Sequence, residues 1–249
     1  MSDVRVLTWN LQGSKGLDVA SVAGVIDASG ADAVVLQEVG RRQCRALAST
    51  LGMDGRWWVF KHWSIKGVPE GGAVITPHRL IATSSFVLRR APFWSWRRRV
   101  AVEATMSRDG QRFAVLGVHL SAHGDAEARR READIVVERA TTHSPQPIIC
   151  GDLNERPGDP GYETIGAAGW LDAWRTVHGT GAEHLGATNW TAGERRGRPP
   201  TQRLDYVLAP PGWRVESCAI AVDTSRLDDA AVLSDHLPVA ALLHPQETR

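Results

Sequence analysis

The stretch Pro147-Ile148-Ile149-Cys150-Gly151-Asp152-Leu153-Asn154 decides how this chain is organised. Its apolar first half predicts a buried strand, because a strand covered on both faces can be continuously apolar. Gly151 ends that run, and the spacing of two predicts that Asp152 and Asn154 point the same way in extended backbone. A carboxylate and an amide at a strand end suit a bound cation or an attacking water. A plain turn is the alternative, since Gly, Asp and Asn favour turns.

The composition indicates an ordinary globular protein. The chain has 249 residues, with 43% hydrophobic and 23% charged residues, and we expect a single domain over residues 1–249. A net charge of +1 requires no polyanionic partner. We find no membrane-spanning stretch and no secretion signal at the start. Three cysteines without a Cys-x-x-Cys pair predict free thiols, and together these features predict a cytoplasmic protein.

A strand, a helix and a second strand are predicted at the start of the chain. Residues 4–9 form an apolar, β-branched run that ends at Asn10, and residues 32–38 form another that ends at Glu38. Between them, Asp18 caps a predicted helix that stops at Gly30. This order predicts a parallel pair with a right-handed crossover.

The rest of the chain predicts antiparallel hairpins followed by further strands and helices. We expect strands at 56–61, 72–76, 80–88, 98–106, 111–120, 201–208, 213–222 and 237–243, helices at 42–51 and 125–142, a short helix ending at 166–169, and loops at 157–161 and 193–200.

Polar side chains recur where these strands begin or end. Each one has a structural explanation by itself, as a cap, a turn residue or a hydrogen-bonded histidine. Together they indicate a ligand site, because open sheets bind ligands along a common edge. The residues are Asn10, Glu38, His119, Asp152, Asn154, Asp205, Asp235 and His236.

The ordered set of motifs resembles the endonuclease/exonuclease/phosphatase superfamily, which includes DNase I. The matching segments are Thr8-Trp9-Asn10, Leu36-Gln37-Glu38, Val118-His119-Leu120, Gly151-Asp152-Leu153-Asn154, Arg203-Leu204-Asp205-Tyr206 and Ser234-Asp235-His236-Leu237-Pro238-Val239. The resemblance covers almost the whole chain. It implies a four-layered α/β sandwich, with two mixed sheets face to face and helices outside, and an active site at one end.

The resemblance also implies a metal-dependent hydrolase of phosphate esters. Glu38 matches the main metal ligand of the family, with Asn10 assisting it, and Asp235 offers another hard oxygen ligand. Such ligands suit Mg²⁺ or Mn²⁺ better than zinc. A divalent cation neutralises the phosphoryl oxygens, whose charge otherwise repels the nucleophile. The alternative for Glu38 is a helix-capping carboxylate.

The remaining residues have expected catalytic roles. His236 would act as a general base or phosphate contact, and Asp205 would fix its tautomer. Asp152 and Asn154 would orient the water and hold the phosphate. His119 would either hydrogen-bond a non-bridging oxygen or protonate the leaving group. Which carboxylate holds the metal and which activates water stays open.

Two segments are candidate substrate contacts. Phe93-Trp94-Ser95-Trp96-Arg97-Arg98-Arg99 interleaves aromatic and cationic residues, as nucleic-acid surfaces do, although a membrane-touching hairpin or a buried hairpin with a solvated end are alternatives. Arg195-Arg196-Gly197-Arg198 could grip a phosphate backbone or form a solvated turn. The predicted contacts are Arg97, Arg98, Arg99, Trp190 and Arg203.

Three functions are therefore compared. The first is a Mg²⁺- or Mn²⁺-dependent phosphodiesterase that cleaves DNA or RNA. The second is a phospholipid or small-molecule phosphohydrolase with the same site. The third is a binding module without activity, which the intact motif set argues against. His119 and His123 also form a His-x-x-x-His pattern, which we interpret as incidental because the intervening glutamate of metalloproteases is missing.

Overall fold

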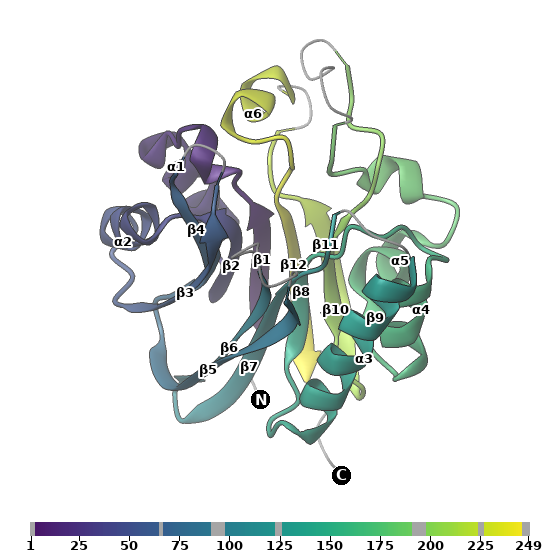
Figure 1. The fold of residues 1–249 in the computed structure, drawn as a ribbon. Coiled ribbons are helices and arrows are strands. Elements are labelled where there is room, and N and C mark those ends of the chain that lie inside the picture. Colours follow the sequence, from purple (N-terminus) through teal and green to yellow (C-terminus); the bar gives the residue numbers. More distant parts are fainter. Residues whose placement is uncertain are drawn as a thin grey trace.

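The computed structural model describes residues 3–64, 67–90, 98–122, 126–190, 198–223 and 227–245. Its centre is a pair of six-stranded mixed sheets with helices on their outer sides (Figure 1). The first sheet has the strand order β11-β12-β1-β2-β4-β3 and the second the order β5-β6-β7-β8-β10-β9. The chain therefore adopts the predicted four-layered α/β sandwich.

The first sheet combines the start of the chain with its end. Its strands are β1 (Val4–Asn10), β2 (Ala33–Val39), β3 (Gly55–Trp63), β4 (Pro69–Thr76), β11 (Trp213–Ile220) and β12 (Val239–Pro245). Helices α1 (Val19–Ser29) and α2 (Arg41–Thr50) cover its outer face. Asp18 caps α1 through the backbone N–H of Ser21, and Gly30 ends it in the left-handed region, as predicted.

The second sheet is built from the middle of the chain. Its strands are β5 (Arg79–Arg90), β6 (Arg98–Arg108), β7 (Gln111–His119), β8 (Ile148–Asp152), β9 (Leu171–Asp172) and β10 (Asp205–Ala209). Helices α3 (Ala126–Thr142) and α4 (Pro160–Ala167) cover its outer face. The remaining helical elements are η1 (Gly13–Lys15), α5 (Ala173–His178), η2 (Glu183–Gly186) and α6 (Leu227–Leu233).

Each sheet has one parallel strand pair at its centre. In the first sheet β1 and β2 pair through the crossover helix α1, and in the second β7 and β8 pair through α3. All other pairings are antiparallel. Residues that follow the two parallel pairs therefore gather at one end of the sandwich, which is where α/β sheets bind ligands.

Three apolar layers hold the sandwich together. The central layer lies between the sheets and is rich in valine and alanine, with Val35, Val102 and Val207 among its members. The outer layers lie between the sheets and their helices. Gly117 allows the sheets to approach closely, because a Cβ there would lie 2.6 Å from Val35 and 2.7 Å from Val102. The strand ends are thereby held at a fixed spacing.

Several sequence-based boundaries were wrong. Helix α4 begins at Pro160 within the predicted loop 157–161, because proline is well suited to the first helical position. Strand β10 begins only at Asp205, four residues after the predicted start at 201. The short elements β9, α5 and α6 were not predicted at all.

Candidate active site

The end of β1 is joined to the end of β8 across the two sheets. Nδ2 of Asn10 donates a 3.0 Å hydrogen bond to Oδ2 of Asp152. Oγ of Ser234 donates to the carbonyl oxygen of Asn10 and accepts from the backbone N–H of His236. The indole N–H of Trp9 donates to the carbonyl oxygen of His236 at 2.8 Å. These bonds fix the segment before β12 against β1 and so position His236.

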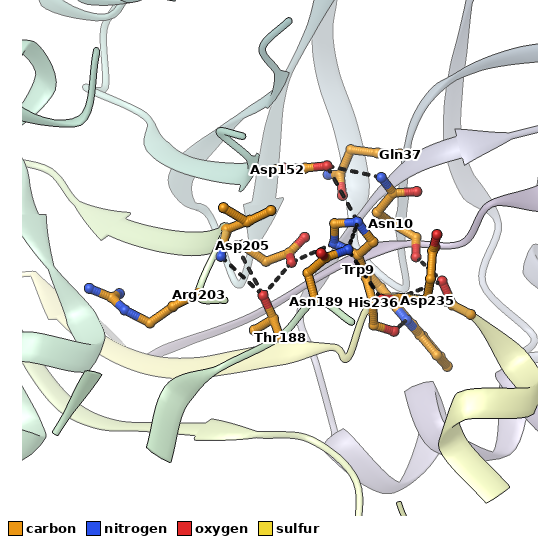
Figure 2. A network of polar contacts seen from close by, with 12 residues as sticks. Trp9, Asn10, Gln37, Asp152, Thr188, Asn189, Arg203, Asp205, Asp235 and His236 are labelled. Carbon is orange, nitrogen blue, oxygen red and sulfur yellow. Dashed lines mark hydrogen bonds and ion pairs between the residues drawn. The ribbon is translucent and has the colours of Figure 1, made fainter. Parts of the chain in front are cut away.

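His236 and Asp205 form a buried pair. Nδ1 of His236 donates to Oδ2 of Asp205 over 2.7 Å, and Oγ1 of Thr188 donates to the same oxygen over 2.6 Å. Nδ2 of Asn189 lies 2.8 Å from Nε2 of His236, and Oδ2 of Asp152 lies 3.8 Å from it (Figure 2). Because Nδ1–H is bonded to Asp205, Nε2 is the ring nitrogen left to face the rest of the site.

His119 lies between two carboxylates at the end of β7. Its Nε2 is 3.6 Å from Oδ2 of Asp152 and 3.9 Å from Oε1 of Glu38. Its Nδ1 is 3.2 Å from Nζ of Lys61, and that ammonium is 3.7 Å from Oε1 of Glu38. Side chains from both sheets therefore meet around His119.

Unusual backbone conformations are concentrated at this end of the sandwich. The described non-glycine residues with positive φ are Gln12 (46°), Glu38 (54°), Asp109 (51°) and Asn154 (49°). Asp109 lies in the tight turn between β6 and β7, where this conformation is normal. The other three belong to the segments that carry the site. Such strain is typical of functional positions, where the surrounding fold enforces it.

Asn154 is brought to Asp152 by a turn and not by extended backbone. Strand β8 ends at Asp152, and the backbone N–H of Asn154 donates to Oδ1 of Asp152 at 2.9 Å. The side-chain Nδ2 of Asn154 donates to the carbonyl oxygen of Leu120 at 3.1 Å. The predicted alternation of side chains was therefore wrong beyond Asp152, because the left-handed conformation of Asn154 ends the extended segment.

Burial and charge shift the protonation of the site in opposite directions. Burial raises the pKa of Asp152 to about 6, although nearby His236 and the bond from Asn10 lower it. Burial alone would lower the pKa of His236, but the carboxylates of Asp205 and Asp152 outweigh it and raise the pKa to about 10. The two carboxylates thus favour a positive charge on His236.

Lys61 and Arg99 bring positive charge to the other side of the site. Burial, and to a lesser extent the Arg99 guanidinium, lower the pKa of Lys61 to about 8. The carboxylates of Glu38, Glu70 and Asp152 act in the opposite direction. Burial also lowers the pKa of Arg99, while Asp152 and Glu38 raise it. Burial, Lys61 and Arg99 together keep the pKa of His119 well below its usual value, so its ring is neutral.

Glu38 is well placed to hold a cation. No described residue donates a hydrogen bond to its carboxylate, and its side chain is 23% exposed, so its oxygens can bind a ligand. Further oxygen ligands belong to the same site: Asp152 lies 3.6 Å from the His119 Nε2 that is 3.9 Å from Glu38, and Asn10 is hydrogen-bonded to Asp152. Such a donor set fits a hard divalent cation.

The other acidic groups are less open to a metal. Asp152, Asp205 and His236 offer ligand atoms that all lie within 4.8 Å of one another. However, Asp205 and His236 already bind each other, which favours proton transfer over metal ligation. Asp235 accepts a short hydrogen bond from Nε2 of Gln12, so its place beside the metal remains a prediction.

Two predicted substrate contacts, Arg203 and Trp190, are buried and bonded to other parts of the fold. Arg203 is 5% exposed and forms ion pairs with Asp172 at 2.7 Å and Glu183 at 2.6 Å. Figure 2 shows its guanidinium directed away from the His236 network. Trp190 is 3% exposed, and its indole N–H donates to the carbonyl oxygen of Arg198. These internal partners favour a structural role for both side chains, and their contact with substrate stays a prediction.

The predicted arginines differ from one another. Arg97 lies outside the described residues, as do His123, Phe93 to Trp96 and Arg195 to Gly197. Arg98 donates to the carbonyl oxygen of Phe60 at 3.0 Å and covers the Phe60 ring. Nη1 of Arg99 is buried without a hydrogen-bond partner among the described residues. Arg99 is therefore the predicted arginine whose charge is available to the site.

Lys61, Thr188 and Asn189 belong to the site but were not predicted from the sequence. Lys61 ends an aromatic-rich run in a chain that has only two other lysines, Lys15 and Lys66, and that rarity was the available signal. Thr188 and Asn189 precede Trp190 in a polar stretch that carries no motif. Their proximity to His236 depends on long-range bridges from Asn189 to Gln202 and His236.

Carboxylates, amides and a histidine–aspartate pair at one end of a four-layered sandwich define a class of phosphoester hydrolases. The profile of the Endonuclease/Exonuclease/phosphatase family matches residues 7–236. The chain belongs to this family. No curated protein matches the sequence. No helix among the described residues has the length and apolar character that crossing a membrane requires.

Solved structures share the fold at low sequence identity. An endonuclease/exonuclease/phosphatase from Bacteroides vulgatus is 22% identical with a TM-score of 0.78, covering 99% of this chain and 100% of that chain. D. rerio TDP2, complexed with a single-strand DNA product, is 18% identical with a TM-score of 0.72, covering 98% and 100%. A mannosyl-6-phosphatase from Bacteroides thetaiotaomicron is 17% identical with a TM-score of 0.72, covering 96% and 99%.

Proposed function

We propose that this protein is a Mg²⁺- or Mn²⁺-dependent phosphodiesterase that cleaves nucleic acid by attack of water on phosphorus. The observation that carries the proposal is the convergence of Asn10, Glu38, His119, Asp152, Asp205 and His236 at one end of the sandwich. Hydrolysis of phosphate esters is the chemistry of the family to which the chain belongs.

Glu38 and Asn10 would hold the divalent cation, with Asp235 as a further candidate. When bound, such an ion neutralises the phosphoryl oxygens and lowers the barrier to attack. An enzyme must lower the activation free energy of phosphodiester hydrolysis by on the order of 20 kcal/mol. Positioning of the reactants and stabilisation of charge must therefore act together.

The chain's own residues would place the nucleophile and the phosphate. A water hydrogen-bonded to both Nε2 of His236 and Oδ2 of Asp152 would be oriented by them, since these atoms are 3.8 Å apart and one water beside the pair can reach both. Asp205 would keep the His236 ring in place through the 2.7 Å bond to Nδ1 and stabilise its positive charge. Asn154, held by the Asp152 turn, would support this position.

Nucleic acid is the first candidate substrate because of the arginine–aromatic region beside the site. Arg98, Arg99 and Phe60 belong to this region, and TDP2 with its DNA product has the same fold. A phosphomonoester of a small molecule is the second candidate. The buried charges of Lys61 and Arg99 favour it, because a monoester carries an additional negative charge, and the mannosyl-6-phosphatase also shares the fold.

A substrate panel tests this proposal. Plasmid DNA, single-stranded DNA, abasic DNA, RNA, a sugar phosphate and sphingomyelin vesicles should be incubated with Mg²⁺, with Mn²⁺ and with EDTA. We expect cleavage of a nucleic acid with either metal and none with EDTA or in Asp152→Ala. If only the sugar phosphate or the lipid is hydrolysed, the substrate is that compound and not nucleic acid. If no compound in the panel is hydrolysed, the proposal is overturned.

A further inference from the structure

Lys61 enters the site through an irregularity in strand β3. The pairing of β3 with β4 shifts between Phe60 and His62, so Lys61 has no partner across the ladder. Such a bulge re-aims the side chain of the inserted residue. The Lys61 side chain is 3% exposed and lines a narrow internal space together with Gly71, Gly72 and Gly117. Burying a lysine is costly, so this position calls for a functional explanation.

The Lys61 ammonium has a specific contact in the site. Its Nζ lies 3.2 Å from Nδ1 of His119, within hydrogen-bond distance, whereas the carboxylate of Glu38 is farther away at 3.7 Å. An ammonium group has donors and no acceptor, so Nδ1 of His119 must accept this bond. The ring proton of His119 is consequently on Nε2.

The Nε2–H group of His119 is available to a ligand. It is 3.6 Å from Asp152 and 3.9 Å from Glu38, beyond hydrogen-bond length, and no other described residue accepts it. Both carboxylates belong to the site, so Nε2–H is directed to where a phosphoryl group would lie. Arg99 adds an unpartnered guanidinium nitrogen to this positive side.

We propose that Lys61 is a positioning residue that orients His119 as an Nε2–H donor to a non-bridging phosphoryl oxygen. Negative charge on these oxygens must be stabilised in the transition state, and a preorganised donor does this without reorganisation. Donation to a non-bridging oxygen leaves the Nε2 proton on the ring, whereas protonation of the leaving group would require Nδ1 to take a proton from Lys61 in the same step. The expected effect on catalysis rests on the proposed function, whereas the His119 tautomer does not.

The tautomer is tested by NMR without any substrate. Two-bond ¹H–¹⁵N spectra of protein labelled at histidine distinguish protonated from unprotonated ring nitrogens, with and without Mg²⁺. We expect His119 to be protonated at Nε2 only, to populate a second tautomer in Lys61→Met, and to keep the original tautomer in Lys61→Arg. His178, whose Nε2 donates to the carbonyl oxygen of Cys218, serves as an unchanged reference. Protonation of His119 at Nδ1 in the wild-type protein would overturn the proposal.

The role of His119 is tested with a series of aryl phosphate esters of increasing leaving-group acidity. His119→Ala should lower kcat about 100-fold and Lys61→Met about 10-fold for every leaving group, with Lys61→Arg retaining more activity than Lys61→Met. A loss that shrinks as the leaving group improves would assign proton donation to His119 and contradict the inference. Failure of the wild-type protein to hydrolyse any ester would instead count against the proposed function and leave the NMR result to decide the tautomer.

Discussion

Glu38 combines a strained backbone with a carboxylate that has the Lys61 ammonium 3.7 Å away but accepts no hydrogen bond from a described residue. The pairing of β2 with β4 shifts between Leu36 and Val39, so this residue interrupts the ladder and turns its side chain toward His119. A fold maintains such a conformation when surrounding contacts enforce it, and functional sites are where this occurs most often. Glu38 is therefore the residue most directly tied to the proposed metal.

Replacing Glu38 by glutamine tests its place in the metal site. The amide keeps the shape but loses the charge, so we expect Mg²⁺ affinity to fall roughly 100-fold, with thermal stability of the metal-free protein nearly unchanged. Isothermal titration calorimetry measures the affinity. Glu138→Gln, an exposed change on α3, is the matched control and should bind Mg²⁺ as the wild type does. Equal affinity of both variants would exclude Glu38 from the metal site.

The buried Asp152 carboxylate should lower the stability of the metal-free protein in a pH-dependent way. Burial raises its pKa to about 6. The folded protein therefore binds a proton more tightly than the unfolded chain, whose aspartate has its ordinary pKa near 4. Stability contributed at this position is present below pH 4 and decreases as pH rises to about 6.

Asp152→Asn should accordingly stabilise the protein in EDTA. At pH 7.5 we expect a gain of roughly 1 kcal/mol, or about 2–4 °C in melting temperature, that declines toward pH 4.5. Activity should be lost in the same variant. Differential scanning fluorimetry at both pH values gives the comparison, and a variant less stable than wild type at pH 7.5 would refute the argument.

At the residue scale, polar residues at strand ends could be predicted as site residues, but the contacts among them could not. Asn10, Glu38, His119, Asp152 and His236 could be selected because each follows or precedes an apolar run. Their contact network depends on distant parts of the chain, which a local pattern does not encode. Lys61 was missed because a bulge, not strand alternation, directs its side chain. The ion pairs of Arg203 were not predicted, because its partners Asp172 and Glu183 are distant in sequence.

At the scale of elements, β8 depends on a glycine that approaches its neighbour closely. Gly151 has a φ of 143°, and a Cβ at this position would lie 2.0 Å from the carbonyl oxygen of Val118 on β7. The β7–β8 pairing brings His119 opposite Asp152. Any side chain at position 151 would separate these two strands.

Gly151→Ala should destabilise the protein by on the order of 3 kcal/mol, or about 10 °C in melting temperature. Gly24→Ala is the matched control: Gly24 lies in α1 with no atom near its Cβ position, so alanine should be neutral or slightly stabilising. Thermal melts of both variants measure the difference. Equal melting temperatures would contradict the close approach of β7 and β8.

Long, strongly patterned elements were predictable, and short ones were not. Strands β1 and β2 and helices α1 and α3 lie within a few residues of their predicted positions. Strand β9 has two residues and α5 has six, too few for a periodic pattern. Helix α5 is instead fixed by Asp172, which caps it, accepts from the Tyr162 hydroxyl and pairs with Arg203.

At the scale of the whole molecule, the two parallel pairs explain why one site forms. The β1–α1–β2 unit brings Asn10 and Glu38 to the same end of the first sheet, and β7–α3–β8 does the same for His119 and Asp152 in the second. Packing the sheets face to face joins these halves. The motif order predicted this architecture, but the substrate could not be predicted, because it depends on side chains other than those at the strand ends.

Metal-dependent hydrolysis in Asp205→Asn tests the central claim most directly. The initial rate should be measured with bis(p-nitrophenyl) phosphate, comparing the wild type and this variant with Mg²⁺, Mn²⁺ and EDTA. We expect the wild type to hydrolyse the ester only with metal. We expect the Asp205→Asn rate to be roughly 10²- to 10⁴-fold lower, because its histidine loses the carboxylate that orients it. Hydrolysis that persists in EDTA, or an Asp205→Asn rate equal to that of the wild type, would contradict the claim.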